Sequence, residues 1–145
     1  MSAIEHDDRL IFLIGQARQR LYTQLDHALL GKAGVTAAQS GALFYLMQND
    51  GCLLVELSLG LMLDKSAITR MTERLEKKGL IVRRPCPRDG RAVRTYLTEA
   101  GRQAAESCLT TVKSYNDAVK EGFSPSEIRN FSRILQTLIQ RFKEE

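Results

Sequence analysis

Apolar residues recur every three or four positions in several parts of the chain, which is the spacing of one face of an α-helix. The first such stretch covers residues 10–28, and Gly31 and Gly34 are expected to end the helix. Its apolar positions are Leu10, Ile14, Ala17, Leu21, Leu25 and Ala28. The pattern therefore predicts a long helix with one apolar stripe near the start of the chain.

Two shorter helices are predicted next. Thr36 and Gln39 have the spacing of a capping box, in which each side chain bonds the other residue's backbone N–H, and an apolar segment follows them. Residues 49–51, with the sequence NDG, are expected to end this second helix. A third, short helix fits residues 53–61, which are rich in leucine.

A fourth helix is predicted from Asp64, as its N-cap, to Lys78, with Gly79 as the stop signal. Its two sides differ in chemistry. Ile68, Met71 and Leu75 fall on one face. The other face carries Ser66, Thr69, Arg70, Glu73, Arg74 and Lys77. We expect the first face to pack against the protein and the second to face solvent.

The segment after Gly79 contains the only β-structure that the pattern predicts. Residues 80–84 (LIVRR) and 91–98 (RAVRTYLT) are rich in β-branched side chains, and the turn-forming sequence PCPRDG separates them. The sequence predicts a β-hairpin with a long tip.

Two helices are predicted at the C-terminal end, over residues 98–122 and from Pro125 onward. Ser124, Pro125 and Glu127 have the spacing of an N-cap, a first helical residue and a capping-box partner. The last helix has an apolar stripe at Ile128, Phe131, Leu135, Leu138 and Phe142. This stripe needs a partner, either the first helix of the same chain or another subunit.

Length and composition limit the class of protein. A chain of 145 residues with 43% hydrophobic and 26% charged residues is expected to form a single folded domain. It lacks a stretch of roughly 20 apolar residues and the order of a signal peptide, which predicts a cytoplasmic protein without a membrane segment. The three cysteines, Cys52, Cys86 and Cys108, form no CxxC pair, so we expect neither disulfides nor a zinc ribbon.

Positive charge is concentrated in one part of the chain. Residues 65–102 contain eleven of the 21 Lys and Arg residues against four acids, a net charge of +7, whereas the whole chain carries +4. Such a run is usually a solvated helix face with internal salt bridges. Here Glu73, Glu76 and Asp89 are too few to neutralise their neighbours, which favours a surface that binds a polyanion.

The order of helices followed by a basic hairpin is that of a winged helix-turn-helix, whose recognition helix enters the DNA major groove. Ser66, Thr69 and Arg70 lie at the N-terminal end of that helix, where side chains contact base edges. Arg74 and Lys77 are placed for phosphate contacts. Arg88, Arg91 and Arg94 of the hairpin are expected to reach the DNA backbone or a narrow minor groove.

The segment DKSAITRMTERLEKKGLIVRRPCPRDGRAVRTYLTEAG resembles the recognition helix and wing of the multiple-antibiotic-resistance regulator (MarR) family, and VTAAQ resembles the start of its second helix. The resemblance covers residues 35–101 and implies a mainly α homodimer with about six helices and a small β-hairpin wing. It implies dimerisation through residues 1–34 and 99–145 and DNA binding through residues 35–98 of a single domain, 1–145.

The same resemblance gives roles to individual residues. Ser66, Thr69 and Arg70 match the base-reading segment. Asp89 and Arg91 match the Asp-x-Arg element of the wing, in which the arginine approaches the minor groove and the aspartate orients the wing. Members of the family usually repress transcription from a pseudo-palindromic operator. They often release DNA when an aromatic or phenolic effector binds, or when a cysteine is oxidised.

Two departures from the family pattern stand in the helix-turn-helix. Met62 occupies the turn where the family usually has glycine, and Gly60 lies two residues earlier. Because a side chain disfavours the left-handed conformation by roughly 1 kcal/mol, we expect a differently built turn. The third helix also begins with Leu53, Leu54 and Val55 where the family is polar, and we expect these residues to be buried.

Several residues have a second interpretation. Cys86, between two prolines and near arginines, is a candidate redox thiol, but an incidental exposed thiol is the commoner case. His6 and His27 with Asp26 are too few for a metal site, so no metal is predicted. Aromatic residues at helical spacing are usually core rather than effector-binding. These are Phe12, Tyr22, Phe44 and Tyr45.

The residues predict a DNA-binding protein, and the resemblance to the MarR family implies a transcriptional regulator, a repressor released by a small-molecule or redox signal. The sequence contains no phosphate-binding loop, HExxH or GxSxG motif, so neither an enzyme nor a cofactor is expected. The alternative is a winged-helix protein-interaction module without specific DNA binding, which uses the apolar segment CLLVELSLGLML or the terminal helices.

Overall fold

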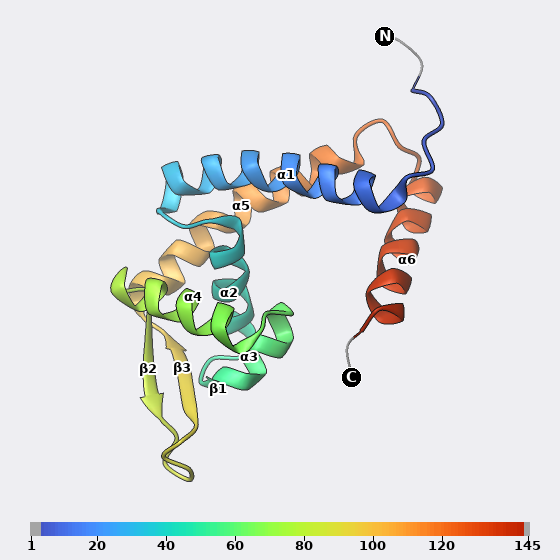
Figure 1. Cartoon of the computed structure of the whole chain (residues 1–145). Helices are drawn as coiled ribbons and strands as arrows, with labels where there is room; N and C mark the ends of the chain where they lie inside the picture. Colours follow the sequence, from blue (N-terminus) through green and yellow to red (C-terminus); the bar gives the residue numbers. More distant parts are fainter. Residues whose placement is uncertain (1–3, 144–145) are drawn as a thin grey trace. The chain divides into compact units, whose positions relative to one another are not determined.

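A computed structural model describes residues 4–143. The chain divides into two compact units, Met1–Val112 and Lys113–Glu145. The elements in chain order are α1 (Leu10–Ala33), α2 (Ala37–Gln48), β1 (Cys52–Leu53), α3 (Leu54–Leu61), α4 (Lys65–Lys77), β2 (Ile81–Pro85), β3 (Val93–Leu97), α5 (Glu99–Lys120) and α6 (Pro125–Arg141) (Figure 1). Helix α5 begins in the first unit and ends in the second.

The predicted helix starts are confirmed by their caps. Thr36 Oγ1 accepts a hydrogen bond from the Gln39 N–H, and Gln39 Oε1 accepts one from the Thr36 N–H, both at 3.1 Å. Asp64 Oδ1 accepts from the Ala67 N–H at 2.7 Å. These side chains satisfy backbone donors that have no partner inside the helix, which fixes where each helix begins.

Helix α1 ends at one of its two predicted stop positions. Gly34 is left-handed (φ 70°), and its N–H donates to the Leu30 carbonyl. The helix continues through Gly31, so that part of the prediction is wrong. A glycine inside a helix costs only about 1 kcal/mol relative to alanine, which the burial of Leu29 on the same turns offsets.

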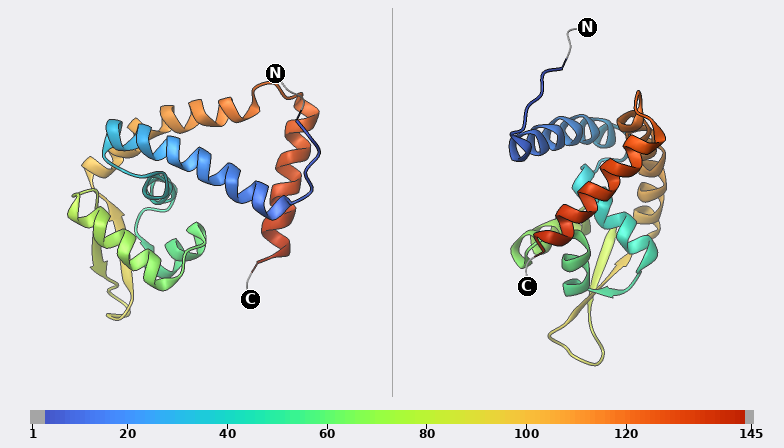
Figure 2. Two further views of the ribbon diagram at one scale, coloured as in Figure 1. Left: turned by 45° about the horizontal axis from the view of Figure 1, so that its top comes forward. Right: turned by 90° about the vertical axis from the view of Figure 1, so that its right-hand side faces the viewer.

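The predicted hairpin is confirmed, and a third strand joins it. Strands β2 and β3 pair antiparallel, with Ile81 opposite Leu97 and Pro85 opposite Val93. Strand β1 pairs with the other side of β3, so the order is β1-β3-β2 and the prediction that the hairpin is the only β-structure is wrong. Two residues are too short to show an alternating pattern, and only the folded chain brings them to β3. The tip of the β2–β3 hairpin extends beyond α3 and α4 (Figure 2).

The core of the first unit lies between α2, α3, α4, the sheet, the C-terminal part of α1 and the N-terminal part of α5. Its largest fully buried aliphatic side chains are Leu29, Val35, Leu43, Leu46, Leu57, Ile68, Leu75 and Ile81. Phe44 and Tyr45 pack against this core, as predicted. Phe12 and Tyr22 of α1 are exposed, so the prediction that they belong to the core is wrong.

The helix-turn-helix keeps a left-handed turn at Met62, so the expectation of a differently built turn is wrong. Met62 has φ 55° and ψ 43°. Its N–H donates to the Leu59 carbonyl, and the Leu63 N–H donates to the Ser58 carbonyl at 2.9 Å. These bonds hold the strained conformation. Gly60 has another role, since a Cβ there would collide with the Tyr45 ring.

The apolar start of α3 is only partly buried. Leu53 and Leu54 are half-buried, whereas Val55 is 59% exposed, so its predicted burial is wrong. Val55, Leu59 and Met62 follow one another at intervals of four and three residues, and we call these exposed side chains the α3 ridge. No helix among the described residues is long and apolar enough to cross a membrane.

The first turn of α5 lies against the start of β2. Thr98 Oγ1 donates to the Gly79 carbonyl at 2.7 Å and accepts from the Gly101 N–H at 3.0 Å. A Cβ on Gly101 would collide with the carbonyl oxygen of Leu80, which is backbone and cannot swing away. Only glycine permits this approach.

We therefore expect Gly101→Ala to lower the free energy of unfolding by about 1–3 kcal/mol, the usual cost of overpacking. Gly31→Ala is the matched control, because it lies in a helix with no atom within 4 Å of the added Cβ. It should raise the free energy of unfolding by about 0.5–1 kcal/mol. Urea unfolding of both variants measures this. Equal stability of the two would contradict the close approach.

Candidate nucleic-acid interface

Helix α4 separates an apolar face from a cationic face. Ile68, Thr72 and Leu75 are buried, and the Thr72 hydroxyl donates to the Ile68 carbonyl at 2.9 Å, which satisfies it within the helix. The predicted DNA-contacting side chains Ser66, Arg70, Arg74 and Lys77 are all exposed. Thr69 is half-buried, and its hydroxyl donates to the Lys65 carbonyl at 2.7 Å.

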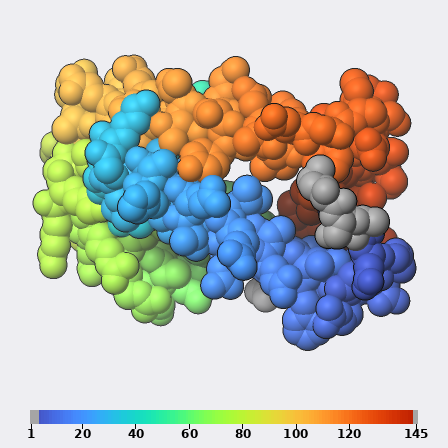
Figure 3. Space-filling view, turned by 90° about the horizontal axis from the view of Figure 1, so that it is seen from above, coloured from blue at the N-terminus to red at the C-terminus, as the bar shows by residue number. Residues whose placement is uncertain are grey.

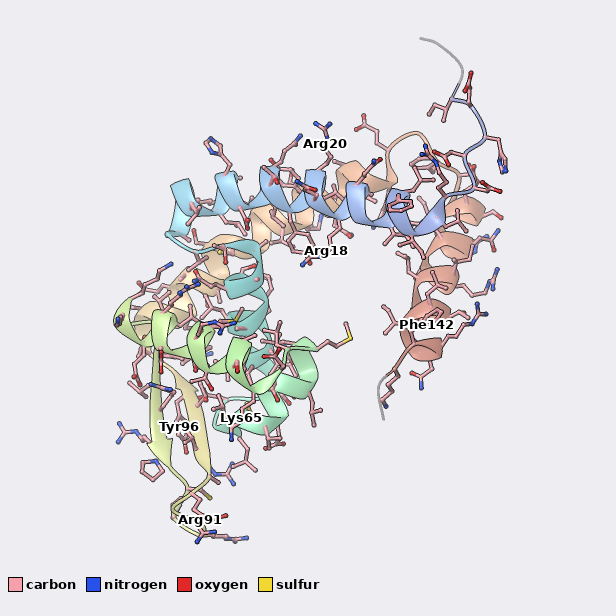
Figure 4. All side chains as sticks on the ribbon, viewed as in Figure 1. Arg18, Arg20, Lys65, Arg91, Tyr96 and Phe142 are labelled. Carbon is pink, nitrogen blue, oxygen red and sulfur yellow. The ribbon has the colours of Figure 1, made fainter. Side chains whose placement is uncertain are left out.

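The tip of the wing is held by its own hydrogen bonds. The Cys86 N–H donates to the Ala92 carbonyl at 2.8 Å, and the Ala92 N–H donates to the Asp89 carbonyl at 3.0 Å. Asp89 Oδ1 accepts from the Arg91 N–H at 3.0 Å. The carboxylate thus fixes the backbone next to Arg91, whose side chain lies at the wing tip (Figure 4). Arg88 and Arg91 are both exposed.

Arg94 differs from the other predicted wing contacts. It lies within β3 and is half-buried, and its Nη1 donates to the Gly51 carbonyl at 2.8 Å. Gly51 precedes β1 and is left-handed, with φ 79°. The guanidinium therefore ties the middle of the sheet to the turn between α2 and β1.

The eleven cations of residues 65–102 fall into two groups. Three of them donate to acceptors inside the protein, namely Lys78, Arg83 and Arg94. Eight side chains have no hydrogen-bond or ion-pair partner among residues 4–143, namely Lys65, Arg70, Arg74, Lys77, Arg84, Arg88, Arg91 and Arg102. A solvated, salt-bridged face would show partners for most of these, so the distribution favours a surface for an external polyanion.

Arg83 forms the ion pair of this region. Its Nη2 lies 3.1 Å from Glu76 Oε1, and its backbone N–H donates to Glu76 Oε2 at 3.1 Å. The hydrogen bonds from Arg83 lower the pKa of the Glu76 carboxyl below its usual value. This pair joins α4 to the first strand of the wing.

Cys86 is buried at the base of the wing tip, at 7% exposure, rather than exposed. The backbone N–H groups of Arg88 and Asp89 lower its thiol pKa, and Arg94 adds to the effect. Burial raises the pKa of Cys52 and Cys108 instead. A redox role for Cys86 stays a prediction.

The two histidines, His6 and His27, are exposed. In the described part of the chain, no group of three His, Cys, Asp or Glu residues is placed to hold a metal ion. Asp26, the third candidate ligand, has a structural task. Its Oδ1 accepts from the Ala37 N–H at 2.7 Å, which adds a second cap to α2.

A groove of about 350 Å³ lies beside the N-terminal end of α4. Leu54, Ile68 and Val93 contribute apolar side chains to its lining, and Lys65 and Arg91 contribute cations. Residues from α3, α4 and the wing meet here. The sequence pattern does not predict this groove, because those segments are not adjacent in the chain.

Comparison with known proteins decides the family. A MarR family profile matches residues 33–92. The multiple antibiotic resistance protein MarR of Escherichia coli (strain K12) is 30% identical over 132 residues, which cover 90% of this chain and 89% of that protein. The chain belongs to the MarR family. The family assignment confirms a transcriptional regulator and not an enzyme.

Solved structures agree with the MarR assignment. A probable transcriptional regulator from Pseudomonas aeruginosa is 32% identical, with a TM-score of 0.81, over 92% of this chain and 98% of that one. The Staphylococcus aureus MepR–DNA complex has a TM-score of 0.89 at 19% identity, over 94% of this chain and 100% of that one. The second likeness concerns the fold alone, and together they confirm the winged helix-turn-helix.

The Glu76–Arg83 pair of this MarR-family protein gives a pH-dependent prediction. A carboxyl whose pKa is lowered by folding stabilises the protein above its unfolded pKa of about 4.3, and this contribution is lost as pH falls through the lower folded pKa. Because the Glu76 side chain is 39% exposed, the contribution is under about 1 kcal/mol.

We expect Glu76→Gln to lower the free energy of unfolding at pH 7 by less than about 1 kcal/mol, with a smaller difference at pH 3, where the Glu76 carboxyl begins to bind a proton. Glu73→Gln is the control, because Glu73 is exposed and has no ion-pair partner in the described chain. Thermal unfolding at both pH values measures the effect. An equal loss at pH 3 would show that the ion pair is not its cause.

Proposed function

We propose that this regulator binds a pseudo-palindromic operator as a homodimer and that its recognition helix and wing make the contacts predicted from the sequence. The observation that carries the proposal is the set of eight cations without internal partners, which includes Arg70, Arg74, Lys77, Arg88 and Arg91. Cations left free by the protein can neutralise phosphates at no cost in internal bonds.

Ser66, Thr69 and Arg70 read base edges in the major groove. Ser66 and Arg70 are exposed on the first turns of α4, where side chains of a recognition helix reach the bases. Although the Thr69 hydroxyl donates to the helix, its oxygen still accepts and its methyl group can contact a thymine methyl. Arg74 and Lys77, one and two turns further along, contact phosphates.

The wing supplies the second contact. Arg88 and Arg91 approach the backbone or the minor groove, and Asp89 orients Arg91 through its bond to the Arg91 N–H. The sequence also predicts a DNA contact for Arg94. Because its guanidinium donates to the Gly51 carbonyl, we assign it an indirect role in DNA binding, in which it holds β3 in place.

The homodimer is proposed from apolar surface on the terminal helices. Leu10, Ile11 and Phe12 of α1 are 62%, 83% and 67% exposed, and the space-filling view shows α1 uncovered along one face (Figure 3). In α6, Phe131, Ile134 and Ile139 are also exposed. A second copy that covers these side chains would place two recognition helices in successive major grooves, about 34 Å apart.

We further propose that the regulator is a repressor released by an aromatic or phenolic effector. The groove beside α4 is within the size range of small-molecule sites, and a bound anion there would compete with DNA for Lys65 and Arg91. Oxidation of Cys86 is the other candidate signal, supported by its lowered pKa. Release of labelled operator DNA by phenolic acids would favour an effector, whereas release by peroxide would favour oxidation of Cys86.

A second candidate function is a winged-helix protein-interaction module. It is favoured by the α3 ridge, in which Leu59 and Met62 are 74% and 73% exposed. Exposed apolar side chains in a row mark interaction sites more often than single ones do. Such a module would show no preference for one duplex sequence.

The test of the proposed function is selection of duplexes from a random DNA pool by the purified protein, followed by titration at two salt concentrations. Enrichment of an inverted repeat, bound with a steep salt dependence, supports the regulator. Weak binding without sequence preference, unchanged by candidate effectors, would favour the interaction module.

Single substitutions locate the contacts. We expect Arg70→Ala and Arg91→Ala each to weaken operator binding by about 30-fold or more, because a contact worth about 1–3 kcal/mol is lost in both copies of the dimer, with the dimer intact. Arg129→Ala removes the same charge from α6, outside the cationic segment 65–102, and should change affinity less than twofold. Anisotropy titration and sedimentation measure binding and assembly. Unchanged affinity in the first two variants would remove the residue roles.

A further inference from the structure

Lys77 and Lys78 are adjacent in the sequence but differ in their surroundings. Both are exposed, but Lys77, the last residue of α4, has no partner in the described chain. Lys78 is the C-cap residue, and its Nζ donates to the Gly34 carbonyl at 2.7 Å and to Gln39 Oε1 at 2.9 Å. Both acceptors lie about 40 residues earlier in the chain, where α1 ends and α2 begins.

The acceptor site of Lys78 suits an ammonium group. Gly34 caps α1, so its carbonyl lies at the negative end of that helix dipole. Gln39 is 7% exposed, and its Oε1 also accepts from the Thr36 N–H in the capping box of α2. The Lys78 ammonium, carried at the end of α4, thus bonds both the end of α1 and the start of α2.

The residues that follow the C-terminal end of α4 are also bonded to Thr98, which precedes α5. The Thr98 hydroxyl donates to the Gly79 carbonyl, and the Thr98 N–H donates to the Leu80 carbonyl at 3.1 Å, so the start of α5 is bonded to the residues that follow α4. The recognition helix is therefore attached at its C-terminal end to α1 and α5, which contain parts of both predicted dimerisation segments.

We infer that Lys78 is a positioning residue that fixes the recognition helix relative to α1 and thereby sets the distance between the two half-sites that the dimer accepts. The inference rests on the proposed function. An ammonium already bound to two oxygens has lost much of its freedom to contact a phosphate, whereas the angle between α4 and α1 determines where each recognition helix enters the DNA.

A phosphate contact and a positioning contact affect DNA binding in different ways. A lost phosphate contact lowers the salt dependence, by about 0.9 in log K against log salt for each contact and about 1.8 for the two copies in a dimer. A lost positioning contact leaves the number of released ions unchanged. It relaxes the geometry instead, so operators with altered half-site spacing become acceptable.

The experiment compares Lys78→Gln, Lys77→Gln and Lys78→Arg by anisotropy titration over a range of salt concentrations and by selection from a pool with randomised half-site spacing. We expect Lys78→Gln to weaken binding by about 2- to 30-fold, with the wild-type salt slope, unchanged half-site bases and a broader range of spacings. Lys78→Arg should restore the wild-type spacing. Lys77→Gln should lower the slope and keep the spacing.

A second variant tests the same contact from the other side. Gln39→Met removes one of the two acceptors of Lys78 but also the capping bond to the Thr36 N–H, so its stability is measured by thermal unfolding beside its spacing range. Lys78→Gln with Gln39→Met should broaden the spacing no further than Lys78→Gln alone. A lower salt slope with unchanged spacing in Lys78→Gln, or wild-type binding in that variant, would overturn the inference. If the wild-type protein selects no inverted repeat, the proposed function itself has failed and the inference falls with it.

Discussion

The recognition helix α4 has to be fixed to the protein without neutralising the cations that face outward, and the rest of the first unit is built around that constraint. Burial of Ile68, Thr72 and Leu75 fixes one face of the helix. Ion pairing along the other face would add little stability, since exposed pairs contribute about 0–1 kcal/mol, and would occupy the groups that bind phosphate. The internal hydrogen bonds and the ion pair are instead made by three other cations of the same segment, Lys78, Arg83 and Arg94.

These three cations connect elements of the protein and are not left free for DNA. Arg83 joins the wing to α4 through Glu76, Arg94 joins β3 to the turn before β1, and Lys78 joins α4 to the junction of α1 and α2. Each one connects two elements and leaves the outward face free. The cationic character of this region therefore has two causes, binding of an external polyanion and attachment of the elements that present the binding groups.

Strain and close packing occur where the elements meet. Met62 keeps a left-handed backbone at the helix-turn-helix, Gly60 makes room for Tyr45, and Gly101 lets α5 approach the carbonyl of Leu80. A tight junction of this kind transmits displacement, because closely packed segments move together rather than deform. The first turn of α5 is thus packed directly against the residues that follow the recognition helix.

The sequence by itself determined the helices, their caps, the hairpin and the outward face of α4, because these depend on periodicity and on contacts between residues three or four positions apart. It could not determine strand β1, the exposure of Val55, the burial of Cys86 or the partners of Lys78 and Arg94. The pairing of β1 and the partners of Lys78 and Arg94 depend on segments about 40 residues apart, and a lysine that bonds two protein oxygens has the same local sequence signal as one without a partner. Only the tertiary structure distinguished them.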